Sequence, residues 1–152
     1  MGWLRLVVLP ILLVSVVACG SGIASGRFSG NGFTITPPDG WEHHSNESQD
    51  RWLEPSGNGM LIVTQSHDYT GTLTEYAASE VVSLQQLMGN PEYEVVQAPQ
   101  GVAVRITNTL PDGSTSLMLV FVQDGVAWKL GFIGMSPAQA ADILVTFGFA
   151  GG

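Results

Sequence analysis

The chain has 152 residues, of which 45% are hydrophobic and 12% are charged, and its net charge is −8. This length is sufficient for one domain with a hydrophobic core and too short to divide comfortably into two domains. The five basic residues form no cluster, which argues against nucleic acid as a partner and against electrostatic docking to an anionic lipid surface.

The beginning of the chain has the pattern of a secretory signal. Met1–Arg5 carries one positive charge, and Leu6–Ala18 is a largely apolar run that ends in small residues. This run is shorter than a bilayer-spanning helix requires, and Pro10 interrupts it, so a transmembrane anchor is the weaker interpretation. We therefore expect residues 1–18 to be a signal peptide.

The only cysteine of the chain follows this run directly. Val16, Val17, Ala18 and Cys19 resemble the lipobox of bacterial lipoproteins, in which an aliphatic, a variable and a small residue precede a cysteine. The resemblance implies that the Cys19 thiol receives a diacylglyceryl group and that Cys19 becomes the new N-terminus. Two acyl chains hold a protein stably at a bilayer, so the implied location is the extracytoplasmic side of a bacterial cell membrane. The alternative is an ordinary signal peptide followed by an unpaired cysteine.

A segment rich in glycine and serine comes next. Gly20–Gly32 has no hydrophobic periodicity, and this composition is typical of a flexible coil. We expect residues 19–32 to be a tether and a single folded domain, residues 33–150, to begin near Phe33.

The first part of this domain contains three candidate strands. Phe33–Thr36 alternates in polarity and ends at a Pro-Pro-Asp-Gly turn, Arg51–Glu54 is a second short strand, and Met60–Ser66 is apolar enough to be buried. Between the first two lies the polar stretch WEHHSNESQD, Trp41–Asp50, which we interpret as a loop.

Two segments have helical patterns. Thr72–Met88 begins with a capping box formed by Thr72 and Glu75, and a second helix begins at Ser136-Pro137 with Gln139 completing its box. The apolar stripe expected for the first helix is Leu73, Tyr76, Ala77, Val81, Leu84 and Leu87 or Met88. The apolar side expected for the second is Ala141, Leu144 and Phe147 or Gly148.

Between the helices the sequence predicts an antiparallel meander of four strands, which are Tyr93–Gln97, Val102–Thr109, Ser116–Gln123 and Val126–Ile133. Asp124-Gly125 is a strong signal for a two-residue hairpin. It predicts a buried row of pairs, namely Phe121 with Trp128, Leu119 with Leu130 and Leu117 with Phe132. A three-residue turn at residues 111–113 predicts pairs on the opposite face, namely Ile106 with Met118, Val104 with Val120 and Val102 with Val122.

This order of three strands, a helix, four strands and a helix defines an α+β class with a mainly antiparallel sheet covered by helices. Together with "PPDGW" at Pro37–Trp41 and "ILVTFGF" at Ile143–Phe149, it resembles the PsbP-like α/β/α sandwich over Phe33–Phe149. That fold occurs in extrinsic proteins of photosynthetic complexes and in bacterial lipoproteins, including actinobacterial ones of the LpqN kind. The resemblance transfers no catalytic residues and implies a binding or accessory role rather than an enzyme.

Candidate chemistry is sparse. Glu42, His43, His44, His67 and Asp68 are the only cluster of metal-ligand types, but no spacing motif supports a site, so we expect no metal and no cofactor. A hydrolase would need a triad of a serine with His67 and Asp68, and the chain has no G-x-S-x-G elbow.

The sequence thus favours a membrane-anchored envelope lipoprotein whose domain binds a protein or glycan partner without transforming it. Trp41, His43 and His44 are the candidate partner-binding residues, because binding residues concentrate on loops of a rigid scaffold. The alternatives are that Trp41 packs in the core and that the stretch is only a solvated connection. Two other functions stay open, a carrier of apolar ligands or lipids and, with less support, a hydrolase.

Overall fold

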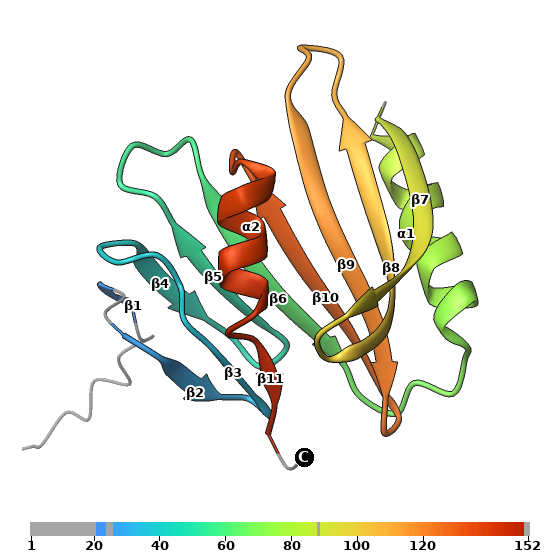
Figure 1. Cartoon of the computed structure of the whole chain (residues 1–152), viewed down its shortest axis with the longest axis horizontal. Coiled ribbons are helices and arrows are strands. Elements are labelled where there is room, and N and C mark those ends of the chain that lie inside the picture. Colours follow the sequence, from blue (N-terminus) through green and yellow to red (C-terminus); the bar gives the residue numbers. More distant parts are fainter. Residues whose placement is uncertain (1–20, 24–25, 88, 151–152) are drawn as a thin grey trace, which may run out of the picture.

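The computed structural model describes residues 21–23, 26–87 and 89–150, which form two antiparallel sheets and two helices (Figure 1). The order of strands across the large sheet is β1 (Ser21–Ile23), β4 (Glu42–Ser45), β5 (Gln49–Leu53), β6 (Met60–Ser66), β10 (Val126–Ile133), β9 (Thr115–Gln123), β8 (Gly101–Thr109) and β7 (Asn90–Ala98). The order in the small sheet is β11 (Gly148–Phe149), β3 (Phe33–Ile35) and β2 (Phe28–Gly30). The helices are α1 (Leu73–Gln86) and α2 (Pro137–Leu144). This architecture confirms the α+β class with a mainly antiparallel sheet.

The two faces of the large sheet are covered differently. Helix α1 packs on one face, where Ala77 joins Val104, Ile106 and Val120 in a small core. Helix α2 and the small sheet cover the other face (Figure 1), and the main core there contains the buried aromatic side chains of the described residues. The large sheet is therefore the middle layer of a sandwich.

The register of the central strands matches the hairpin prediction. Phe121, Leu119 and Leu117 lie opposite Trp128, Leu130 and Phe132. The next ladder pairs Val104 with Val120 and Ile106 with Met118, as the three-residue turn requires. Because side chains alternate along a strand, this register sends the first row to the main core and the second to the core under α1.

Both capping boxes are present. The Thr72 and Ser136 hydroxyls accept hydrogen bonds from the backbone N–H groups three residues later, and both boxes are completed by a side chain at that position. The apolar side predicted for α2 is confirmed in part, because Leu144 packs against the main core and Phe147, just beyond the helix, is buried. Ala141 is wrong. It is exposed, and Ala140 and Ile143, three residues apart on the sheet-facing side, are buried instead.

The ordered fold begins earlier than the sequence predicts. Phe28–Gly30 is strand β2, which pairs with β3, and the Phe28 ring lies 5.2 Å from the Trp52 ring and 5.4 Å from the Phe33 ring. The prediction that residues 19–32 form a flexible tether is therefore wrong at both strands. Ser21–Ile23 pairs with β4, and Phe28–Gly30 pairs with β3 and is held by the packing of Phe28. The predicted signal peptide and Cys19 lie outside the described residues. Within the described ranges, no helix is long and apolar enough to span a membrane.

The central row gives a stability prediction. Leu119→Ala should lower the free energy of unfolding by about 2 to 5 kcal/mol, the range for truncating a buried leucine. Val102→Ala is the matched control on the neighbouring strand, because Val102 is 57% exposed. Urea denaturation of both variants measures the difference, and equal small losses would mean that Leu119 does not lie in the core.

A second prediction concerns the end of β10. Gly134 has a positive φ of 66°, and a Cβ added there would collide with the carbonyl group of Asn58. Gly113 also has a positive φ, 85°, but a Cβ there meets nothing within 4 Å. Gly113→Ala should therefore cost about 1 to 2 kcal/mol for the left-handed backbone alone, and Gly134→Ala should cost clearly more. Thermal unfolding of the two variants compares them directly, and equal costs would contradict the close approach.

Candidate functional site

A pocket of about 370 Å³ is lined in part by Phe149 and Ala150, at the C-terminal end of the described residues. Its lining comes from five segments of the chain, namely the β2–β3 turn, the β4–β5 turn, the end of β6, the β9–β10 hairpin and the residues of β11. These segments are far apart in sequence, so the pocket exists only in the folded molecule.

The deep part of the pocket is built on one pair of opposite residues. Gln65 of β6 and Trp128 of β10 are partners in the antiparallel ladder, so their side chains lie next to one another on the same face. They are 6% and 5% exposed, and the ring of Phe149 lies 5.3 Å from that of Trp128. An amide and two aromatic rings therefore form the inner wall.

The amide of Gln65 has an acceptor without a partner. Its Oε1 atom is buried and makes no hydrogen bond, although a buried polar atom normally has one. Gly32 lies close to this atom. A Cβ on Gly32 would lie 3.5 Å from the Trp128 ring and 3.9 Å from Gln65 Oε1, in a backbone conformation with φ of 79° that disfavours any side chain.

The rim of the pocket is polar and acidic. Asn31, Glu47, His67 and Asp124 contribute exposed side chains, and Gln123 a half-buried one. In the described part of the chain, no lysine or arginine belongs to this lining. The rim therefore carries two carboxylates and one histidine, with no lysine or arginine of the lining to balance the carboxylates.

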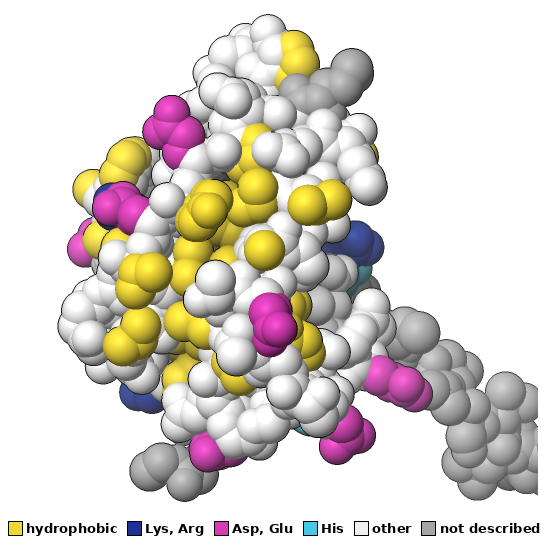
Figure 2. All heavy atoms as spheres, turned by 90° about the vertical axis from the view of Figure 1, so that its right-hand side faces the viewer, with side chains coloured by type: hydrophobic (Ala, Val, Ile, Leu, Met, Phe, Trp, Pro, Cys, Tyr) yellow, Lys and Arg dark blue, Asp and Glu magenta, His cyan; other side chains and the backbone are white. Residues whose placement is uncertain are grey.

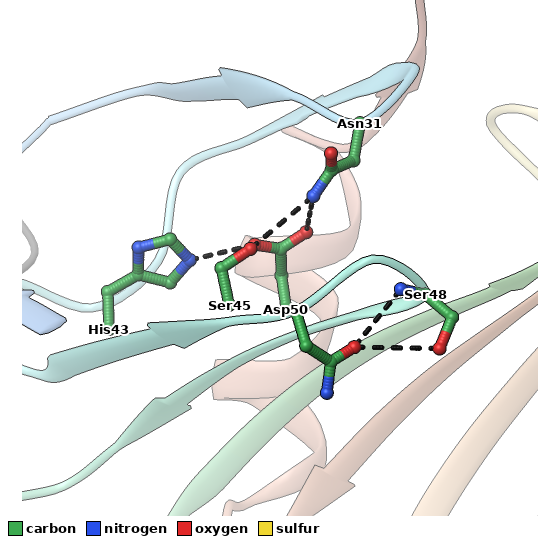
Figure 3. A network of polar contacts seen from close by, with 6 residues as sticks. Asn31, His43, Ser45, Ser48 and Asp50 are labelled. Carbon is green, nitrogen blue, oxygen red and sulfur yellow. Dashed lines mark hydrogen bonds and ion pairs between the residues drawn. The ribbon is translucent and has the colours of Figure 1, made fainter. Parts of the chain in front are cut away.

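A network of three side chains holds one part of this rim (Figure 3). The Asn31 amide donates a hydrogen bond of 2.7 Å to Asp50 Oδ2, and His43 Nε2 lies 2.9 Å from Asp50 Oδ1. Asp50 is 1% exposed, and the His43 ring stacks on Trp52 at a centroid distance of 4.7 Å. Asn31 has a positive φ of 49°. Its hydrogen bond to the buried Asp50 carboxylate holds the β2–β3 turn in this conformation at the mouth of the pocket.

The stretch Trp41–Asp50 is not a loop, which corrects the sequence interpretation. Residues 42–45 form β4, which pairs with β5 in a hairpin. Trp41 is buried in the main core, and His43 is half-buried against Trp52, so both make packing contacts. His44 faces the other side of the strand, where its Nε2 atom lies 3.2 Å from Glu42 Oε1. A partner-binding role for these residues stays a prediction.

The sequence singles out few residues of the pocket, namely His67 as a metal or triad candidate and Glu47 within the stretch Trp41–Asp50. It predicts only core packing for Trp128 and places Asn31 and Gly32 in the expected tether. One local signal existed, because Gln65 occupies the same alternating face of β6 as the buried Leu61 and Val63. A glutamine in a row of core positions indicates a polar group with a structural or binding role.

The metal-ligand residues do not converge. Over the described ranges, no group of three or more His, Cys, Asp or Glu side chains is placed to hold a metal ion. His67 lines the pocket, whereas Asp68, with a positive φ of 56°, belongs to the turn that follows β6.

A second surface differs in chemistry from the pocket. Figure 2 shows hydrophobic side chains gathered on the side of the molecule formed by α1 and β7. The large exposed apolar residues of these elements and their neighbours are Val82, Leu87, Tyr93, Val95 and Val102. Strand β7 is also an edge of the large sheet. The acidic pocket and this apolar side are therefore separate features.

The fold is of the PsbP/Mog1p type, as two solved structures show. The solution structure of cyanobacterial PsbP (CyanoP) from Synechocystis matches with a TM-score of 0.57 at 16% identity, over 89% of this chain and 95% of that one. The crystal structure of the Saccharomyces cerevisiae Ran-binding protein Mog1p matches with a TM-score of 0.52 at 14% identity, over 84% of this chain and 96% of that one. No protein-family model and no curated protein matches the chain.

The network under the rim yields a prediction with an internal control. His43→Ala should lower the free energy of unfolding by about 1 to 3 kcal/mol, because it removes one of the partners of the buried Asp50 carboxylate. His44→Ala should stay within about 0.5 kcal/mol, as for surface positions. Chemical denaturation measures both, and equal effects would show that the His43 contact with Asp50 does not stabilise the fold.

Proposed function

We propose that the chain is a membrane-anchored envelope lipoprotein whose sandwich is a non-enzymatic binding domain, with the pocket around Gln65 and Trp128 as its ligand site. The observation that carries this proposal is the buried, unpartnered Gln65 Oε1 in a pocket walled by aromatic rings. Small-molecule sites are typically concave and largely apolar, with a few convergent polar groups.

Binding is favoured over catalysis by the chemistry of the site. Within the described residues, no serine hydroxyl is hydrogen-bonded to a histidine. The buried carboxylate of Asp50, in the β4–β5 hairpin, is hydrogen-bonded to His43 and Asn31. A nucleophile with an adjacent base is the arrangement that a hydrolase requires. Mog1p is a Ran-binding protein, so a binding role has a precedent in this fold.

A carrier of apolar ligands is the weaker candidate. The main core fills one face of the large sheet with side chains from α2 and the small sheet, and α1 fills the other face. A lipid carrier needs an apolar cavity of several hundred Å³. The pocket reaches that size, but its rim is polar and charged.

Membrane attachment rests on the lipobox resemblance of residues 16–19. A fatty-acid analogue should label the wild-type chain in its host, and Cys19→Ala should abolish both the label and recovery in the membrane fraction. Val17→Ala is the matched control, because Val17 occupies the variable position and its change should preserve labelling. A labelled, membrane-bound Cys19→Ala variant would contradict the lipoprotein assignment.

Ligand binding can be followed at the tryptophans. In the mature chain labelled with fluorotryptophan, Trp128 lines the pocket whereas Trp41 and Trp52 are buried elsewhere in the core. Fluorine NMR in detergent should show a shift of the Trp128 resonance alone when the correct ligand class is added from a panel of a cation, a sugar, a dicarboxylate and a fatty acid. If no class shifts Trp128, the pocket is not a ligand site.

A further inference from the structure

We infer that the pocket binds an organic cation, a guanidinium or ammonium group, with the Gln65 carbonyl as acceptor, the Trp128 and Phe149 rings as walls and the Glu47 and Asp124 carboxylates at the rim. This inference deepens the proposed function and rests on the pocket being the ligand site.

The buried Gln65 Oε1 atom lacks a hydrogen-bond donor. Gln65 Oε1 can only accept hydrogen bonds, and it is buried without a donor beside Trp128. A ligand that completes this site must therefore bring an N–H or O–H group past Gly32, where a Cβ would occupy part of the space beside Gln65 Oε1. Guanidinium and ammonium groups are donors without acceptors, so they match a lone buried acceptor.

The rim of the pocket carries two negative side chains, Glu47 and Asp124. They lie on two different turns, and both line the same pocket. Among the described residues, no lysine or arginine belongs to this lining. The whole chain adds to this field with a net charge of −8. A cation is attracted by this arrangement and an anion is repelled, whereas a neutral sugar can donate hydrogen bonds to the two carboxylates but gains no attraction between opposite charges.

Two aromatic side chains, Trp128 and Phe149, form a wall of the pocket. The Trp128 and Phe149 ring centroids are 5.3 Å apart, and both residues belong to the pocket lining. The face of a tryptophan ring attracts a cation, and arginine-like groups also stack on it. The same wall would serve a sugar, so the carboxylates are the feature that separates the two ligand classes.

The volume limits the ligand to a small one. About 370 Å³ is at the lower end of the range of small-molecule pockets. It suits either a free small amine or guanidine, or the end of one lysine or arginine side chain of a partner protein. The shared chemistry is a single positively charged donor group.

The test uses an isosteric pair of probes. Butylguanidinium and butylurea have nearly the same shape, but only the first carries a charge. In the fluorine NMR titration, butylguanidinium should shift the Trp128 resonance, and butylurea should bind at least tenfold more weakly. Increasing salt should weaken the binding of butylguanidinium, because screening reduces its attraction to the exposed carboxylates.

Variants of the two rim carboxylates test whether these side chains attract the cation. Glu47→Gln and Asp124→Asn should each weaken butylguanidinium binding about two- to fivefold, the range for an exposed ion pair. Asn at position 124 tolerates the positive φ of 53° found there, so the hairpin is preserved. Glu92→Gln is the control, because Glu92 lies on β7, outside the pocket, and its change should leave the affinity unaltered.

The source of the cation is tested by comparing butylguanidinium with a capped Gly-Arg-Gly peptide. Tighter binding of the peptide supports a partner protein, and binding of the small probe alone supports a free metabolite. Equal affinity for butylurea, or no effect of both carboxylate variants, overturns the inference. In that case a shift of Trp128 by the sugar keeps the proposed binding function, whereas no shift by any class overturns both.

Discussion

The β9–β10 hairpin is the element on which the rest of the molecule depends. Its two-residue turn, Asp124-Gly125, fixes a register in which Phe121 lies opposite Trp128, and a slip by one residue would move every side chain of both strands to the opposite face. On its other side β10 pairs with β6, and this long-range ladder places Trp128 beside Gln65. The main core therefore depends on one tight turn, and the inner wall of the pocket depends on that turn together with the pairing of β6 and β10.

The N-terminal segment completes the pocket from the other side. Strand β2 is short, and it is held by Phe28 against Trp52 and by the bond from Asn31 to the buried Asp50. The C-terminal end is fixed to the same place, because the Ala150 N–H donates a hydrogen bond of 2.7 Å to the Gly32 carbonyl. The β2–β3 turn and the last described residues thus meet at the pocket, and neither can be removed without opening it.

The fold does not specify the ligand. Chains that share only 14% to 16% identity with this one adopt the same architecture, so the sandwich is a scaffold on which different surfaces are built. In this chain the open end of the sandwich is acidic and aromatic, whereas the side formed by α1 and β7 is apolar. Function must therefore be argued from these surfaces, and the pocket offers the more specific chemistry because it combines charge, a buried acceptor and an aromatic wall.

The sequence by itself determined the elements whose causes are local. The Asp124-Gly125 turn, the capping boxes at Thr72 and Ser136, and the alternation of the central strands involve residues a few positions apart, so their patterns are legible along the chain. Only the tertiary structure decided that Phe28–Gly30 and Glu42–Ser45 are strands, because each is stabilised by a partner that sequence periodicity does not reveal. The pocket belongs to the same category. Its lining converges from five segments between Asn31 and Ala150, and such convergence is set by long-range strand order rather than by any local pattern.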